Sequence, residues 1–138
     1  MKMASKWHMQ PCPICAEGTL YDGVQEQEIE YKGKLYRYTS KGAFCDHCLD
    51  GFPVHDPKEE AKWLKFRDQV DADELVELAR IRKKLKLTQQ QAAAISGGGK
   101  NAFSRYERGQ AKPVYAVINL FRLLDKHPEL LDELEISR

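Results

Sequence analysis

The sequence from residue 88 to residue 110, TQQQAAAISGGGKNAFSRYERGQ, predicts two short helices joined by a glycine turn. Thr88 and Gln91 have the spacing of a capping box, in which each side chain accepts a hydrogen bond from the other residue's backbone at the start of a helix. The alanine-rich helix that follows should stop at glycines 97–99, because glycine tolerates the left-handed conformation that ends helices. A second helix is expected over about residues 100–108. The two helices together form a helix-turn-helix, whose second helix can enter the major groove of DNA.

The second helix of this unit separates apolar from polar side chains. Phe103 and Tyr106 are three positions apart and are expected to face the core. Asn101 and Arg105, four positions apart, share another face. Because asparagine can bond adenine and arginine can bond guanine, each through two hydrogen bonds, Asn101 and Arg105 are the predicted base-reading pair. Two local alternatives remain open, since Asn101 can cap the helix and Arg105 can pair with Glu107 or a phosphate.

Positive charge is concentrated around this unit. The formal net charge of the chain is only +1, yet residues 79–112 contain nine Lys or Arg residues and one acidic residue, Glu107. Most basic clusters are simply a solvated helix face, but one that overlaps a helix-turn-helix suits the phosphate backbone of DNA. The residues that we expect to contact DNA phosphates are Arg82, Lys83, Lys84, Lys100, Ser104 and Arg108.

Upstream of the helix-turn-helix, the sequence predicts two helices separated by a linker. The stretch KEEAKWLKFRDQ follows Pro57 and repeats apolar residues at helical spacing. We place the linker at residues 67–73. The second helix should start at a capping box formed by Asp71 and Glu74 and end near Lys86. The side chains expected to pack from the first of these helices are Ala61, Leu64 and either Trp63 or Phe66.

The remaining elements are predicted from prolines and from β-prone residues. Pro113 and Pro128 are each suited to open a helix, because proline is favoured in the first helical turn. Before residue 53, TLYDGV and EIEYKGKLYRY are typical of strands, with Lys32-Gly33 as the hairpin turn between them. The sequence therefore predicts an α+β chain, with a small β-rich domain at 1–68 followed by an all-α helix-turn-helix domain at 69–138.

Two cysteine pairs lie in the β-rich part. Cys12-Pro-Ile-Cys15 and Cys45-Asp-His-Cys48 are C-x-x-C motifs separated by twenty-nine residues. Two such motifs can supply the four thiolates of a closed tetrahedral site, so all four cysteines are predicted ligands of one structural Zn²⁺ per chain. A closed site leaves no position for water, and the metal should therefore stabilise the fold rather than catalyse. The alternatives are a redox dithiol, buried cysteines, an iron–sulfur cluster, or a ligand contributed by His8, His47 or His55.

Length and composition exclude several classes of protein. With 138 residues, 42% hydrophobic and 31% charged, the chain suits one domain or two very small ones. It has no apolar run near the roughly 18 residues of a membrane-spanning helix and no secretory signal, so we expect a cytoplasmic protein with no membrane partner. It also lacks clustered carboxylates and a nucleophile beside a base, and the sequence predicts that it is not an enzyme.

Several stretches together carry a resemblance to a known family. They are Leu87-Thr88-Gln89, Gly97-Gly98-Gly99, the run from Asn101 to Glu107, and the run from Asp125 to Leu131. With these stretches the chain resembles the MqsA-type antitoxins of bacterial toxin–antitoxin systems over nearly its whole length. The eleven residues before Cys12 are a departure, because the family usually begins close to its first cysteine. They are expected to be disordered or to precede the true start, for which Met9 is available.

The resemblance implies a function for each domain. A zinc-finger domain would bind and neutralise an mRNA-cleaving toxin, and an XRE-type helix-turn-helix domain would form a homodimer and repress transcription from a palindromic operator. The motif match places the four cysteines on the zinc ligands and Asn101 and Arg105 on the base-reading pair. An alternative function is a zinc-containing helix-turn-helix transcriptional regulator without a toxin partner.

Overall fold

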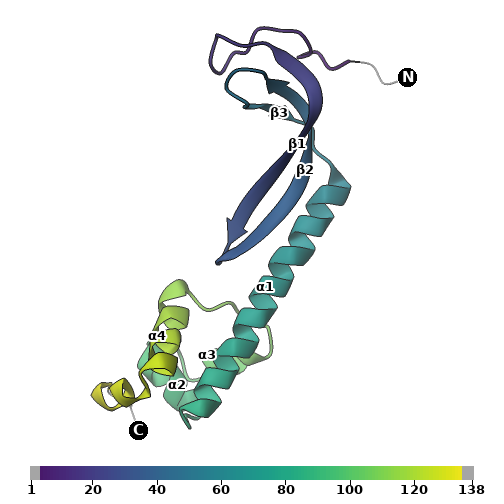
Figure 1. The fold of residues 1–138 in the computed structure, drawn as a ribbon. Coiled ribbons are helices and arrows are strands. Elements are labelled where there is room, and N and C mark those ends of the chain that lie inside the picture. Colours follow the sequence, from purple (N-terminus) through teal and green to yellow (C-terminus); the bar gives the residue numbers. More distant parts are fainter. Residues whose placement is uncertain (1–3, 135–138) are drawn as a thin grey trace. The chain divides into compact units, whose positions relative to one another are not determined.

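The computed structural model describes residues 4–134 and confirms the α+β class (Figure 1). A three-stranded antiparallel sheet has the order β1-β2-β3, and helices follow it along the chain. The chain divides into two compact units, Met1–Arg67 and Asp68–Arg138. The elements are β1 (Leu20–Tyr31), β2 (Lys34–Cys45), β3 (Gly51–Pro53), α1 (Pro57–Lys84), α2 (Gln89–Ser96), α3 (Ala102–Glu107), α4 (Tyr115–Lys126) and the 3-10 helix η1 (Pro128–Glu133).

Strands β1 and β2 form the predicted hairpin. Their pairing runs without interruption from Leu20 opposite Cys45 to Tyr31 opposite Lys34. The turn residues Lys32 and Gly33 both have positive φ, 50° and 82°, as a two-residue turn between twisted strands requires. The Lys32-Gly33 turn is thus confirmed, and its register places one end of the sheet beside the second C-x-x-C motif.

Aromatic rings hold the first turns of α1 against one face of this hairpin. The Tyr36 ring centroid lies 5.3 Å from that of Trp63 and 4.9 Å from that of Phe66. The expectation that Ala61 and Leu64 would pack here is wrong, because both side chains are exposed. Trp63 and Phe66 occupy the contact instead, since large aromatic rings bury more apolar area than alanine or leucine at neighbouring positions.

The predicted linker at 67–73 is also wrong, because α1 is one continuous helix of 28 residues. Asp71 does not cap a helix start. It lies buried within α1 and pairs with Lys112, with 2.7 Å between Nζ and Oδ2. The sequence between Pro57 and Lys84 contains no further proline and no glycine, and polar residues alone do not end a helix.

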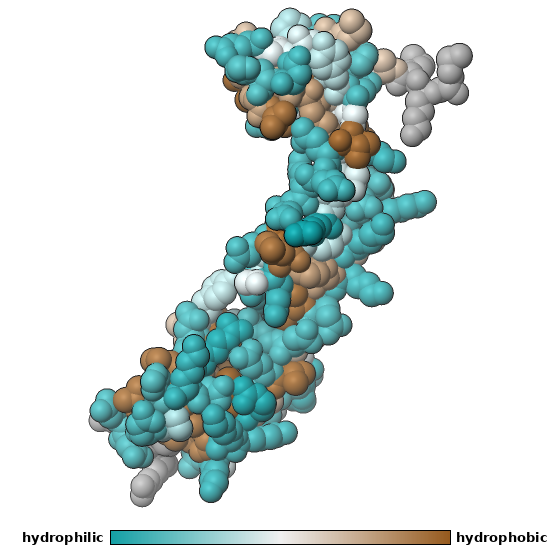
Figure 2. Space-filling model, in the orientation of Figure 1, coloured by the Kyte–Doolittle hydropathy of each residue, from teal (hydrophilic) through white to brown (hydrophobic). Residues whose placement is uncertain are grey.

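The second unit is built around one apolar core. Its buried members come from α1, α2, α3 and α4 and from Leu87 between α1 and α2, and the Phe103 and Phe121 ring centroids are 5.0 Å apart. Most of the visible surface of this unit is hydrophilic, and its hydrophobic residues form small separate patches (Figure 2). The core residues are Leu78, Ile81, Leu87, Ala92, Ala93, Phe103, Val117, Ile118 and Phe121.

The helix ends agree closely with the local sequence signals. The Gln91 backbone N–H donates to Thr88 Oγ1 at 3.1 Å and the Thr88 N–H donates to Gln91 Oε1 at 2.9 Å, which confirms the capping box. Gly97 ends α2 with a φ of 80°. Pro128 begins η1 as expected, whereas α4 begins at Tyr115 rather than at Pro113.

Candidate metal centre and nucleic-acid interface

The fold brings the four cysteine sulfurs into one cluster. All four Sγ atoms lie within 4.8 Å of one another. The Sγ of Cys12 is 3.8 Å from that of Cys48, and the Sγ of Cys15 is 3.7 Å from that of Cys45. A tetrahedral ion with metal–sulfur bonds of about 2.3 Å has sulfur–sulfur edges of about 3.8 Å, so the cluster can hold such an ion.

Backbone hydrogen bonds fix the two C-x-x-C motifs. The Cys12 N–H donates to the Gly18 carbonyl at 2.9 Å, and the Cys45 N–H donates to the Asp50 carbonyl at 2.8 Å. The backbone at residue 18 passes close to Cys45 Sγ, and only glycine fits there, because a Cβ atom at this position would collide with that sulfur. The spacing of the cysteines gave no signal for this glycine.

The electrostatics of the cluster favour a bound cation. Backbone hydrogen bonds from Glu17 and Gly18 lower the pKa of the Cys15 thiol to about 6. At Cys48 a backbone hydrogen bond from Asp50 favours the thiolate, but burial and the neighbouring sulfurs together outweigh it and raise the pKa to about 12. Four thiolates at this separation repel one another, and a divalent metal would remove that repulsion.

None of the histidines suggested as a substitute ligand joins this cluster within residues 4–134. His47 Nε2 lies 2.7 Å from Glu17 Oε2, and His55 Nε2 lies 3.3 Å from Glu60 Oε2. The His8 ring accepts a hydrogen bond from the Asp22 backbone N–H through Nδ1 at 3.0 Å. The donor set is therefore composed of sulfur alone, which suits a soft or borderline metal.

The residues before Cys12 pack and hydrogen-bond within the first unit, and the expectation that they are disordered is wrong for residues 5–10. The Trp7 ring stacks on Phe52 with 4.2 Å between ring centroids, and both residues pack against the buried cluster formed by Cys12, Leu20, Ala43 and Cys45. The Met9 N–H donates to the Leu20 carbonyl at 2.7 Å. Sequence reasoning missed Trp7 because its partner lies on β3, far along the chain.

In the helical unit, Arg105 on α3 and Asn101 directly before this helix are presented to solvent. Both side chains are exposed, whereas Phe103 between them is fully buried. Asn101 precedes the helix and makes no capping hydrogen bond with its side chain. The alternative pairing of Arg105 with Glu107 does not occur, because the Glu107 carboxylate is bound elsewhere. These two polar side chains therefore remain available to an external ligand.

Arg82 binds Glu107 in a half-buried network beneath α3. The Arg82 Nη2 and Nε atoms donate to the two Glu107 oxygens at 2.8 and 2.9 Å, and Nη1 donates to the Leu87 carbonyl at 2.9 Å. Gln89 donates to the same carboxylate at 3.2 Å. The Arg82 and Glu107 side chains are only 13% and 14% exposed. Arg82 thus holds α1, α2 and α3 together, and its guanidinium is already occupied.

Lys84 also has a partner within its own unit. Its Nζ donates to the Asp125 carbonyl and to Asp125 Oδ1, both at 2.8 Å. Arg80 pairs with the other oxygen of the same carboxylate at 3.0 Å. Hydrogen bonds from Arg80 and Lys84 lower the pKa of Asp125 to about 2. This network ties the end of α1 to the end of α4.

The other phosphate candidates are less constrained. Lys83, Lys100 and Arg108 are exposed, and Ser104 is half-buried on α3. Arg108 Nε donates to the Ser104 carbonyl at 3.2 Å, which leaves the rest of its guanidinium free to bind another group. Lys83, Lys100 and Arg108, unlike Arg82 and Lys84, have no ion pair with any residue in the described range 4–134.

Over the described part of the chain, no helix is both long and apolar enough to cross a membrane.

The comparisons with known proteins agree with the architecture. Residues 9–135 match the family model described as the antitoxin component of a bacterial toxin–antitoxin system, MqsA. The chain is also 39% identical over 128 residues to a protein of Escherichia coli (strain K12) named antitoxin MqsA, with 89% of this chain and 98% of that protein covered.

Proposed function

Because the chain belongs to the MqsA family of antitoxins, we propose that it neutralises a toxin that cleaves mRNA and represses transcription at a palindromic operator. The exposed side chains of Asn101, directly before α3, and Arg105, on α3, support the DNA-binding half of this proposal. Membership of the antitoxin family supports the toxin-binding half of the proposal. Residues 1–68 would bind the toxin, and residues 69–138 would form the homodimer that binds DNA in the cytoplasm.

The metal in this proposal is one Zn²⁺ per chain, held by Cys12, Cys15, Cys45 and Cys48. Four thiolates are typical of structural zinc, and the sulfur–sulfur distances of 3.7 and 3.8 Å suit its bond length. With all four positions taken by sulfur, the metal would have no site for water or substrate. The protein would then act by binding rather than as an enzyme.

On DNA, Arg105 would bond a guanine and Asn101 an adenine in the major groove. Lys83, Lys100, Ser104 and Arg108 would contact phosphates on either side. Arg82 and Lys84 were predicted for the same role, but they bind Glu107 and Asp125 in the free chain. We therefore assign them to holding the helices in place, with any phosphate contact requiring those ion pairs to open.

Two measurements on the full zinc-loaded chain test this function. In the first, cells that express the cognate toxin should regain growth when the chain is co-expressed. In the second, the chain should bind its own promoter DNA far more tightly than a scrambled duplex. Promoter binding without growth rescue or co-purification of a toxin would instead support a transcriptional regulator that has no toxin partner.

A further inference from the structure

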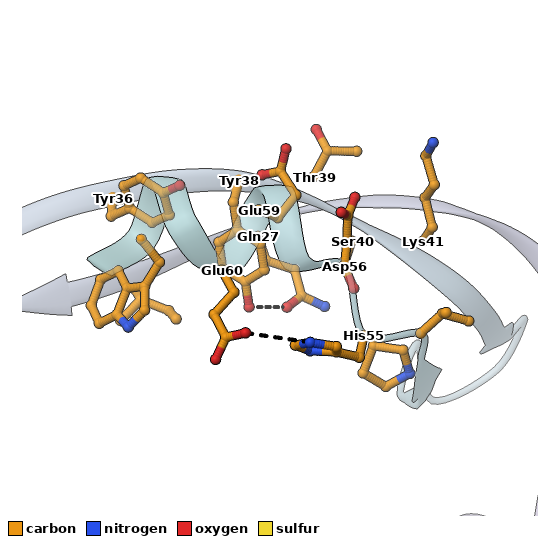
Figure 3. Close-up of a pocket in the computed structure, with 14 residues that line it drawn as sticks. Gln27, Tyr36, Tyr38, Thr39, Ser40, Lys41, His55, Asp56, Glu59 and Glu60 are labelled. Carbon is orange, nitrogen blue, oxygen red and sulfur yellow. Dashed lines mark hydrogen bonds and ion pairs between the residues drawn. The ribbon is translucent and has the colours of Figure 1, made fainter. Parts of the chain in front are cut away.

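A pocket of about 320 Å³ lies between the hairpin and the start of α1, away from the cysteine cluster (Figure 3). Three of its lining residues are the aromatic residues Tyr36, Tyr38 and Trp63. Tyr36 and Tyr38 alternate along β2 and therefore share a face of the sheet, with 5.9 Å between their ring centroids. The Tyr38 hydroxyl donates to Gln27 Oε1 at 2.6 Å, which fixes that ring. We refer to this site as the aromatic pocket.

Carboxylates outnumber cations around the aromatic pocket. Asp56, Glu59 and Glu60 line it, and they come from the residue before α1 and from the first turn of that helix. Glu59 pairs with Lys62 at 3.0 Å and Glu60 with His55 at 3.3 Å, and all of these side chains except that of Glu59 are more than half exposed. Exposed pairs of this kind are weak and exchange readily. Lys41 lies at the opposite end of the pocket from Tyr36 (Figure 3).

Ser40 supplies a further polar group of the aromatic pocket. Ser40 is only 8% exposed and lines the pocket, two residues after Tyr38 on the same face of β2. A serine hydroxyl can both donate and accept a hydrogen bond, so Ser40 adds a polar group that a ligand in the pocket could bond.

We propose that the aromatic pocket receives an arginine side chain of the partner protein. Aromatic faces attract a cation, the flat guanidinium stacks on rings better than an ammonium does, and its several N–H groups can bond carboxylate and hydroxyl oxygens together. This inference rests on the proposed function, in which the first unit binds an mRNA-cleaving toxin. Such a toxin must present cationic side chains to hold RNA phosphates, and the acidic aromatic pocket is complementary to them.

The pocket itself is tested with two short peptides, acetyl-Gly-Arg-Gly-amide and the same peptide with neutral citrulline in place of arginine. The chain has two tryptophans, and the pocket contains Trp63 but not Trp7, so their indole N–H signals report separately by NMR. The arginine peptide should shift the Trp63 signal and leave that of Trp7 unchanged, and the effect should weaken as added salt screens the charges. Equal shifts with the citrulline peptide would overturn the proposal.

Two matched double variants then distinguish the effect of the pocket carboxylates from the effect of the net charge of the chain. Glu59→Gln with Glu60→Gln should weaken binding of the arginine peptide about tenfold, because two carboxylates facing the guanidinium are neutralised. Glu26→Gln with Glu30→Gln makes the same change in net charge on the other face of β1 and should have no effect. Equal weakening by both pairs would show that only the net charge matters and would contradict the assignment.

The same variants tested against the cognate toxin distinguish this inference from the proposed function. The wild-type chain should bind the toxin, and the Glu59/Glu60 variant should bind it about tenfold more weakly. If the wild-type chain binds no toxin, the proposed function fails, whatever the peptides show. If the wild-type chain and the Glu59/Glu60 variant bind toxin equally well, the proposed function stands and the toxin does not use the pocket.

Discussion

The cysteine-bearing unit and the helical unit differ in what stabilises them. The first has a core cluster of four buried residues, of which two are cysteines, whereas the second has a core cluster of nine buried apolar residues, eight of them from α1, α2, α3 and α4. A core of four residues buries too little apolar surface to hold a small domain together, and a metal can supply what is missing. One chain can therefore combine a unit that depends on metal-ligating cysteines for its stability with a unit that is stabilised by an apolar core.

The largest expected effect comes from removing a metal ligand. Cys45→Ser should abolish zinc binding and unfold the cysteine-bearing unit, because zinc binding in comparable domains contributes roughly 10 to 16 kcal/mol to folding. The helical unit should keep its own cooperative thermal transition. Elemental analysis and thermal melting followed by circular dichroism measure the two outcomes. Loss of the helical transition would show that the two units do not fold independently.

Truncation of the helical core should have the opposite pattern. Phe103→Ala should lower the free energy of unfolding of the helical unit by about 3 to 5 kcal/mol, because the ring is fully buried against Phe121 and Tyr106. The zinc content should stay at one equivalent. Leu123→Ala is a suitable control, since Leu123 is half-exposed on α4 and should change stability by less than about 1 kcal/mol. Urea denaturation of the three proteins decides whether burial accounts for the difference.

A smaller effect is expected on DNA recognition, with the fold intact. Arg105→Ala should cost about 1 to 3 kcal/mol at the operator and relax the choice of one guanine, and Asn101→Ala should do the same at a neighbouring adenine. Lys100→Ala should weaken binding to any duplex and reduce its salt dependence, because a phosphate contact is lost. Titrations against operator and scrambled DNA at several salt concentrations measure this. Equal weakening by Arg105→Ala on both duplexes would mean that Arg105 contacts only phosphates.

The smallest effect concerns the exposed ion pairs at the end of α1. The pKa of Asp125 is lowered from 3.8 to about 2, so its ionised form is favoured in the folded state. Its contribution to stability is therefore present above pH 3.8 and disappears as the pH falls through about 2. Asp125→Asn should be less stable than the wild type near neutral pH and equally stable near pH 2. Thermal melting of both proteins across this pH range tests the prediction. The control is Asp132→Asn, which removes one carboxylate and leaves the contacts of Asp125 with Arg80 and Lys84 in place.

Two of the errors in the sequence predictions have a common physical cause. Asp71 and Glu74 have the spacing of a capping box, yet both lie buried inside α1, where a distant lysine, Lys112, pairs with Asp71. Arg82 looked like a free phosphate ligand, but it binds Glu107, twenty-five residues further along the chain. Local spacing cannot show which side chain a distant element will contact. The roles predicted for Asp71 and Arg82 depended on such contacts and therefore needed revision.

The sequence by itself determined the features that arise from neighbouring residues. The Thr88–Gln91 capping box, the left-handed Gly97 and the Lys32-Gly33 turn were all predicted, because each depends on backbone geometry within a few positions. Only the tertiary structure decided which long-range partners meet. It brought the four sulfurs to tetrahedral spacing, stacked Trp7 on Phe52 and formed the aromatic pocket against the start of α1. These contacts depend on how strands and helices pack, and packing minimises the free energy of a whole unit rather than of one segment.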